Sequence, residues 1–168
     1  PREGLVFLYL GNLERYQGLD LLLESFSRAH AERPDLILAI AGGTPADLAA
    51  YRKQADARGI GAAVRFLGPR PVSEMGSLFA AADVLVSPRI TGSNTPMKIY
   101  SYLDSGKPVL ATDLPTHTQA LTPEIALLAP PEPGPFAAAM LRRANDPALR
   151  RTLGANGRAR ARAAHSRA

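Results

Sequence analysis

The sequence contains no cysteine and no tryptophan, and it has no long hydrophobic run. Without cysteine the chain cannot form a disulfide framework, supply a thiol nucleophile, or hold a Cys-ligated zinc ion or iron–sulfur cluster. No apolar run approaches the roughly 18 residues that a membrane-spanning helix needs, and no charged-then-apolar leader opens the chain. These absences predict a soluble, cytoplasmic protein.

The size and composition of the chain indicate one globular unit. It has 168 residues, of which 46% are hydrophobic and 21% are charged. A chain of this length buries about 70% of its extended surface on folding, so it can form a packed core. Its composition is close to the globular average, which argues against disordered, collagen-like and coiled-coil chains. We therefore expect residues 1–168 to form a single domain, with closing helices from about 136 to 164.

The net charge of +5 is unevenly distributed along the chain. From Arg142 onward there are eight arginines and one acid, a net charge of +7, whereas residues 1–141 hold 12 basic and 14 acidic side chains, a net charge of −2. The basic charge is therefore one C-terminal segment and not a domain-wide field, which argues against a nucleic-acid-binding core. No Phe, Tyr or Trp follows Phe136, so this segment also lacks a platform on which bases could stack.

Short apolar runs alternate with amphipathic segments along the chain. The expected strands are residues 5–10, 36–41, 63–67, 83–87, 108–111 and 125–129. The expected helices are 19–30, 45–58, 73–82, a helix capped by Thr95-Pro96 and ended by Gly106, 136–144 and 147–164. Strands that alternate with helices through short connections form a parallel sheet with helices on both faces. The predicted fold class is therefore α/β, a Rossmann-like doubly wound parallel sheet of about six strands.

In this fold class ligands bind outside the carboxyl ends of the strands, where loops lead into helices. Four such loops are expected, at residues 11–18, 42–45, 68–73 and 88–96. None carries a dinucleotide fingerprint, because the first strand is followed by Gly-Asn-Leu and not by Gly-x-Gly-x-x-Gly. The pair Gly106-Lys107 lacks the earlier glycine of a phosphate-binding P-loop.

The three histidines do not form a metal site. His30, His117 and His165 are far apart in the sequence and show no ligand spacing. We expect His30 and His165 on solvated helix faces. The sequence therefore predicts no metal and no cofactor.

The segment 87–98 is the strongest candidate for a binding site. A strand runs into a polar loop there and then into a helix, which leaves unpaired backbone N–H groups at the ligand-binding edge of the sheet. Such an arrangement is suited to an anion. The competing interpretation is an ordinary loop with a good N-cap, because many helix N-termini bind no ligand.

Two stretches of the chain, DVLVSP at 83–88 and KIYSYLDSGKPVLAT at 98–112, together resemble the signature region of glycosyltransferase family 4, the large group of two-domain GT-B retaining transferases. Four further segments are similar to other landmarks of that family, in the same order: GNL at 11–13, GLDLL at 18–22, AGG at 41–43 and VRFLG at 64–68. The resemblance covers about Leu5 to Gly157. It implies a half of a GT-B fold.

The resemblance implies the C-terminal half, which holds the nucleotide-sugar donor, while a missing N-terminal domain binds the acceptor. We therefore expect no sugar transfer by this chain alone. The nucleotide-diphosphate-sugar would be a substrate, and no cofactor is implied. The arginine-rich final helix would meet the missing domain or an anionic membrane surface, which would make a cytoplasmic protein membrane-peripheral. A solvated basic helix without a partner is the alternative.

The sequence departs from the family where the ligand is expected. The family's diphosphate-binding arginine and lysine align with Asn12 and Gln17, and its two glutamates, eight positions apart, align with Ser93 and Ser101. Two cations and two anions have thus become neutral, so the formal charge of the four positions is unchanged in total, which suggests retuning more than decay. Nearby cations that could replace the lost pair are Arg15, Arg89 and Lys98.

The sequence thus predicts the donor-binding half of a retaining glycosyltransferase with an unknown acceptor. No catalytic residue is assigned. The expected substrate-binding residues share a position at the carboxyl edge of the sheet and are Gly11, Asn12, Gln17, Arg89, Ser93, Asn94, Thr95, Met97, Lys98 and Ser101. The first alternative is a non-catalytic nucleotide- or partner-binding domain derived from such a transferase, which the four neutral replacements favour. A basic-tailed module for nucleic acid or membrane ranks last.

Overall fold

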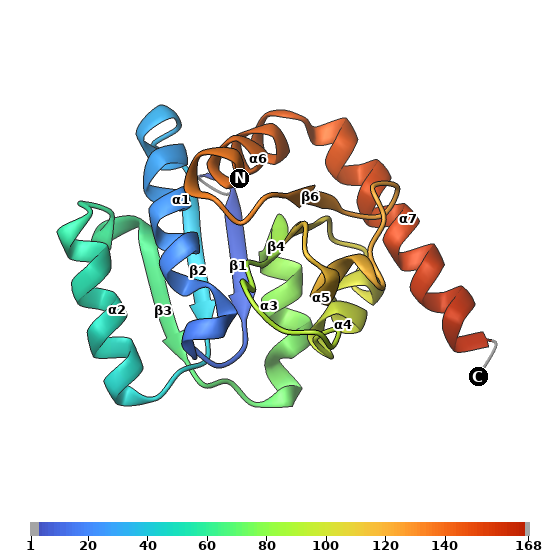
Figure 1. Ribbon diagram of the computed structural model, residues 1–168, viewed down its shortest axis with the longest axis horizontal. Coiled ribbons are helices and arrows are strands. Elements are labelled where there is room, and N and C mark those ends of the chain that lie inside the picture. Colours follow the sequence, from blue (N-terminus) through green and yellow to red (C-terminus); the bar gives the residue numbers. More distant parts are fainter. Residues whose placement is uncertain (1–3, 167–168) are drawn as a thin grey trace.

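A computed structural model describes residues 4–166, with side chains through Ala164. Its six strands form one parallel sheet in the order β3-β2-β1-β4-β5-β6 (Figure 1). The strands are β1 Val6–Leu10, β2 Ile37–Ala41, β3 Val64–Gly68, β4 Val84–Ser87, β5 Val109–Thr112 and β6 Leu127–Ala129. The chain winds outward from β1 to β3 and then returns to β4 on the other side of β1. The predicted doubly wound, Rossmann-like sheet is therefore confirmed.

In the described part of the chain, residues 4–166, seven α-helices connect or follow the strands. They are α1 Leu19–Glu32, α2 Pro45–Ala57, α3 Met75–Ala81, α4 Lys98–Asp104, α5 Pro115–Thr118, α6 Pro133–Asn145 and α7 Pro147–Ser166. Figure 1 shows α7 running past the edge of the sheet beyond α4 and α5. Within residues 4–166 no helix is both long and apolar enough to cross a membrane.

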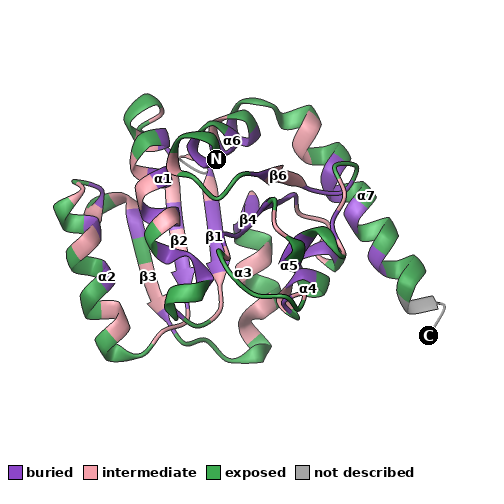
Figure 2. Ribbon diagram, viewed as in Figure 1, coloured by how far each residue is buried: buried purple, intermediate pink, exposed green. Residues whose placement is uncertain are grey.

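The sheet separates two apolar layers. Along β1, Phe7 and Tyr9 face the layer that contains α1, α2 and α6, whereas Leu8 faces the layer that contains α3, α4 and α7. All three side chains are buried, because a central parallel strand is covered on both faces. The buried residues therefore follow the sheet, and the outer helix faces are exposed (Figure 2).

Local sequence explains why α2 begins where it does. The Thr44 side chain accepts a hydrogen bond from the Asp47 amide at 3.1 Å, and the Asp47 carboxylate accepts one from the Thr44 amide at 3.1 Å. This reciprocal capping box satisfies two amides that the helix itself leaves unpaired, and Pro45 occupies the first turn without losing a bond. The predicted cap at Thr44 is confirmed.

The predicted cap at Thr95 is wrong. Helix α4 begins at Lys98, and no side chain caps it. The residues before it form a tight turn, in which the amide of Ile99 donates to the carbonyl of Pro96 at 3.1 Å and that of Tyr100 to Met97 at 3.2 Å. This i→i+3 turn separates Thr95 from the helix, so its hydroxyl is not placed to cap the first amides.

Other element ends also differ from those predicted. The strands shift by at most two residues. Helix α3 begins after a 3₁₀ turn at Val72–Glu74, so Ser73 does not open it. Helix α6 begins at Pro133 and not at Phe136, since proline fits the first turn of a helix. Helix α5 was not predicted from the sequence.

The predictions for two histidines have different outcomes. His30 is half-buried, with its ring centroid 5.6 Å from that of Phe26, so its predicted solvated position is only partly correct. The side chain of His165, and Arg167 of the basic segment, lie outside the described residues.

Candidate functional site

A pocket of about 520 Å³ lies at the carboxyl edge of the sheet, where the loops after β1 and β4 meet the start of α4. β1 and β4 are neighbours from which the chain continues in opposite directions, so the pocket lies at the topological switch point of the sheet. Seven of the ten predicted binding residues line it: Gly11, Asn12, Gln17, Arg89, Met97, Lys98 and Ser101. Leu10, Met75 and Pro96 complete the lining.

Lys98 crosses from α4 to the end of β1. Its ammonium donates a hydrogen bond to the carbonyl of Leu10 at 2.8 Å and lies 4.3 Å from the ring centroid of Tyr9. Gly11 permits this approach, because a Cβ there would lie 2.7 Å from Nζ and the φ of +148° favours glycine. Burial, reinforced by the charge of Arg89, lowers the pKa of Lys98 to about 7. The charged form of Lys98 therefore gains from a nearby anion.

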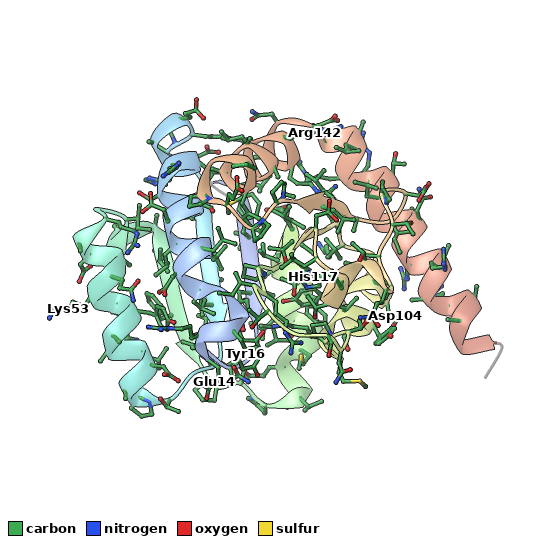
Figure 3. The ribbon with its side chains drawn as sticks, in the orientation of Figure 1. Glu14, Tyr16, Lys53, Asp104, His117 and Arg142 are labelled. Atoms are coloured by element: carbon green, nitrogen blue, oxygen red, sulfur yellow. The ribbon has the colours of Figure 1, made fainter. Side chains whose placement is uncertain are left out.

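Arg89 follows β4, and its side chain reaches toward the loop that follows β1. Its guanidinium carbon lies 5.0 Å from the ring centroid of Tyr16, and its Nε donates to the carbonyl of Thr91 at 3.0 Å. Figure 3 shows Tyr16 in the loop that follows β1. A cation–π contact and a backbone hydrogen bond thus orient Arg89 without neutralising its charge.

Two neutral amides stand where the family has cations. Gln17 is buried, and its Nε2 lies 3.4 Å from Oδ1 of Asn12, an oxygen that also accepts the amide of Glu14 at 3.0 Å. The Asn12 amide nitrogen lies 3.3 Å from the hydroxyl of Tyr16. These side chains are therefore mostly committed to holding the loop after β1, and the cations of the pocket come from β4 and α4 instead.

Three predicted residues lie in the loop but outside the pocket lining: Ser93, Asn94 and Thr95. The carbonyls of Ser93 and Asn94 accept hydrogen bonds from Gln119 and Thr116. Within residues 4–166, the backbone amides of Asn94, Thr95, Met97 and Lys98 donate no hydrogen bond. The loop is thus fixed through its carbonyls, while these amides are free for a ligand.

The remaining candidates differ in exposure. Met97 is 80% exposed at the pocket rim, and Ser101 is exposed about one turn further along α4. Arg15 is exposed in a 3₁₀ turn and does not line the pocket. The lining therefore contains two cations, and no carboxylate occurs among its described residues. An arrangement of this kind attracts an anion.

A buried polar cluster that contacts the backbone of Arg89 was not predicted from the sequence. Ser87, Thr112 and His117 have no exposed surface, and the His117 Nε2 lies 2.7 Å from the Ser87 hydroxyl. The expected binding loops did not include the one after β5, from which α5 carries His117. The sequence signal that could have revealed the cluster was the pair Thr116-His117, which follows β5 at the carboxyl edge of the sheet.

The protein family of the chain follows from comparison with known proteins. Residues 1–160 match the family described as glycosyl transferases group 1, and the chain belongs to that family. Its fold corresponds to the C-terminal half of GT-B enzymes.

One curated relative and two solved structures of the same fold illustrate the match. A phosphatidyl-myo-inositol mannosyltransferase of Mycobacterium tuberculosis is 29% identical over 143 residues, 84% of this chain and 37% of that protein. The structure of Anabaena Alr3699/HepE in complex with UDP and glucose has a TM-score of 0.85 at 19% identity, over 95% of this chain and 44% of that one. The C-terminal domain of a glycosyl transferase group 1 protein (LpcC) from Francisella tularensis has a TM-score of 0.84 at 18% identity, covering 96% and 86%.

The chain covers different shares of the known proteins that it matches. The chain spans little more than a third of the mannosyltransferase but most of the isolated C-terminal domain. The family match and the shared fold confirm the resemblance that the segments at 83–88 and 98–112 carry. The binding roles of the individual residues stay predictions.

Proposed function

We propose that the chain is the donor-binding half of a retaining glycosyltransferase, which holds a nucleotide-diphosphate-sugar while an N-terminal domain binds the acceptor. The observation that carries this proposal is the pocket at the switch point, where Arg89 and Lys98 converge without a carboxylate among the described lining residues. A diphosphate supplies the negative charge that this pocket lacks. Retention of configuration is what the resemblance to family 4 implies.

The pocket would act mainly through electrostatics. As the bond between sugar and diphosphate breaks, negative charge builds up on the leaving phosphate, and preorganised donors stabilise that charge. Lys98 and Arg89 would supply charge-assisted hydrogen bonds, and the free amides of residues 94, 95, 97 and 98 would supply neutral ones. Asn12 and Ser101 would add weaker polar contacts. With these groups the proposal includes no metal or other cofactor.

The two candidate cations would replace the family's arginine and lysine, which are Asn12 and Gln17 in this chain. The ammonium of Lys98 lies beside Gly11 and Leu10, close to the loop in which the family has its arginine and lysine. The guanidinium of Arg89 stacks on Tyr16 of the same loop. Positive charge is therefore present at the expected place although its sequence positions differ. The bound UDP and glucose of Anabaena Alr3699/HepE, which shares this fold, are consistent with the proposal.

A non-catalytic domain remains the second candidate function. The observation that favours it is the pair Ser93 and Ser101, which stand where the family has glutamates. Ser93 lies outside the pocket lining, and its carbonyl is bound to Gln119. Such a domain would bind nucleotide but would not transfer sugar, even when joined to its acceptor domain.

We also propose that α7 contacts an anionic membrane surface. Arg151, Arg158 and Arg162 are exposed on one helical face and surround a shallow groove that includes Ala155 and Ala159. Within residues 4–166 none of the three arginines has an ion-pair partner, so they can bind lipid phosphates. The M. tuberculosis relative is named for phosphatidyl-myo-inositol, a lipid, which supports a membrane-peripheral role.

The donor-binding proposal is tested by titrating the chain with UDP and with GDP while backbone amides are observed by NMR. The expected result is saturable shifts at Asn94, Thr95, Met97 and Lys98. Shifts confined to the arginines of α7 would contradict it, because they would indicate non-specific charge binding. Sugar transfer by the chain joined to an acceptor domain, and none by the chain alone, then separates the transferase from the non-catalytic domain.

A further inference from the structure

The loop between β4 and α4 has no regular secondary structure, yet it carries Arg89, which lines the pocket, and the free amides of Asn94, Thr95 and Met97. A loop of this kind keeps one conformation only if side chains hold its backbone. Side chains that do this come from one neighbouring segment, residues 112–119, which contains the end of β5 and all of α5. Four of its side chains hydrogen-bond to residues 87–94: Thr112, Thr116, His117 and Gln119.

His117 is at the centre of this contact. Figure 3 shows it in the interior of the molecule, and its ring has no exposed surface. Nδ1 lies 2.9 Å from the carbonyl oxygen of Thr112, which can only accept, so Nδ1 carries the proton. Nε2 is then the acceptor for the hydroxyl of Ser87, at 2.7 Å. Burial lowers the pKa of His117 to about 4, so the ring is neutral at pH 7, in agreement with this tautomer.

Thr112 extends the contact to the pocket. Its hydroxyl donates to the backbone carbonyl of Arg89 at 2.5 Å. Each donor in the cluster therefore has an acceptor: Ser87 donates to His117, His117 to Thr112, and Thr112 to Arg89. Thr116 fixes the same loop further on, because its hydroxyl donates to the carbonyl of Asn94 at 2.8 Å.

We propose that His117 is a positioning residue for the donor pocket: together with Thr112 it joins the ends of β4 and β5 and fixes the backbone of Arg89, so that the guanidinium is held ready for a diphosphate. This inference rests on the proposed function. His117 itself does not reach the pocket lining and acts only through Thr112 and Arg89. Its role is preorganisation, which reduces the ordering that a ligand must otherwise impose.

The test is a double-mutant cycle with Thr112→Val and Arg89→Ala, read out as affinity for UDP and GDP. Thr112→Val preserves shape and the backbone carbonyl that accepts from His117, and it removes the hydroxyl that holds Arg89, an oxygen that also lies 3.0 Å from Nδ1 of His117. We expect Thr112→Val alone to weaken binding roughly three- to tenfold, and to have no further effect when Arg89 is already alanine. The matched control is Thr118→Val, an exposed threonine of α5, the helix that carries His117, which should bind as wild type does. An equal loss in both backgrounds, or no loss, would overturn the proposal.

A second readout does not depend on nucleotide binding. Hydrogen exchange at the Ile90 amide, which donates to the carbonyl of Tyr16 at 3.0 Å, reports the order of the loop in the free chain. It should be faster in Thr112→Val and in His117→Phe than in wild type and Thr118→Val. If wild type binds neither UDP nor GDP, the proposed function fails while this readout still decides the positioning role. Unchanged exchange in Thr112→Val would overturn it even if His117→Phe does not fold.

Discussion

Two groups of cations in this chain carry the same kind of charge in opposite surroundings. In the pocket, Lys98 and Arg89 are half-buried, and each is oriented by an aromatic ring and a backbone carbonyl. On α7, Arg151, Arg158 and Arg162 are exposed to solvent. The fold therefore holds the first group in one geometry, whereas the second is exposed along a helix.

The difference shows why the total charge is a poor guide to function. The C-terminal segment dominates the net charge of the chain, whereas residues 1–141, with a net charge of −2, contain the pocket. Exposed charges are screened by salt, whereas a partly buried cation is screened less, and its burial disfavours the charged form unless an anion is near. The two regions should therefore respond to different substitutions.

The largest effect is expected on membrane binding. Replacing Arg151, Arg158 and Arg162 together with alanine should weaken binding to vesicles that contain anionic lipid roughly a hundredfold, because each arginine near such a surface contributes about 1 kcal/mol. Vesicle co-sedimentation measures this. The UDP affinity of the same triple variant should stay close to that of wild type.

The control for this effect removes the same charge elsewhere. Arg52, Lys53 and Arg65 are exposed on the side of β3 and α2, and Figure 3 shows Lys53 pointing outward. Their triple alanine variant should retain vesicle binding. If both triple variants lose binding equally, the effect is one of net charge, and the comparison between regions fails.

A smaller effect is expected on UDP affinity when the pH is raised. Because burial lowers the pKa of Lys98 to about 7, this side chain loses its proton as the pH rises from 7 to 9, while a nucleoside diphosphate keeps its full negative charge. UDP affinity should therefore fall about tenfold across this range, by calorimetry. A Lys98→Arg variant stays charged and should have a much flatter profile. A flat profile in wild type would show that Lys98 does not contact the ligand.

The smallest effect on UDP affinity is expected from a substitution at Gly92, in the loop that carries Arg89. Gly92 has a φ of +125°, and a Cβ there would lie 2.9 Å from Nε and Nη2 of Arg89. Gly92→Ala should displace the guanidinium and weaken UDP binding roughly threefold. Gly76→Ala is the control, because a Cβ at that helical position meets no atom within 4 Å. Equal affinity of both variants would contradict the assigned position of Arg89.

The fold followed from the sequence because its signals are local and periodic. All six strands were predicted to within two residues, since each is an apolar run ended by glycine, proline or a polar residue. The helix that begins at Pro45 was predicted for the same reason, as its cap lies in four consecutive residues. Thr95 shows where such local prediction fails: Thr95-Pro96 is typical of a helix N-cap, but a tight turn lies between Thr95 and α4.

The site was only partly predictable, because its geometry depends on contacts between distant segments. That Lys98 reaches Leu10 depends on the pairing of β1 with β4 and on the position of α4, which no local pattern encodes. The cluster of Ser87, Thr112 and His117 joins residues up to 30 positions apart. Of the three cations considered, only the structure separates Arg15, outside the lining, from the two inside it.

The central claim is that Lys98 and Arg89 make the pocket a diphosphate site. The most direct measurement is the affinity for UDP and GDP, by calorimetry at low and high salt, of wild type, Lys98→Ala, Arg89→Ala and Arg158→Ala. Each pocket variant should lose about tenfold or more, because a hydrogen bond to a charged group contributes about 1.5 to 3 kcal/mol, whereas Arg158→Ala should bind like wild type. Equal affinity of all four chains, or no binding by wild type, would contradict the claim.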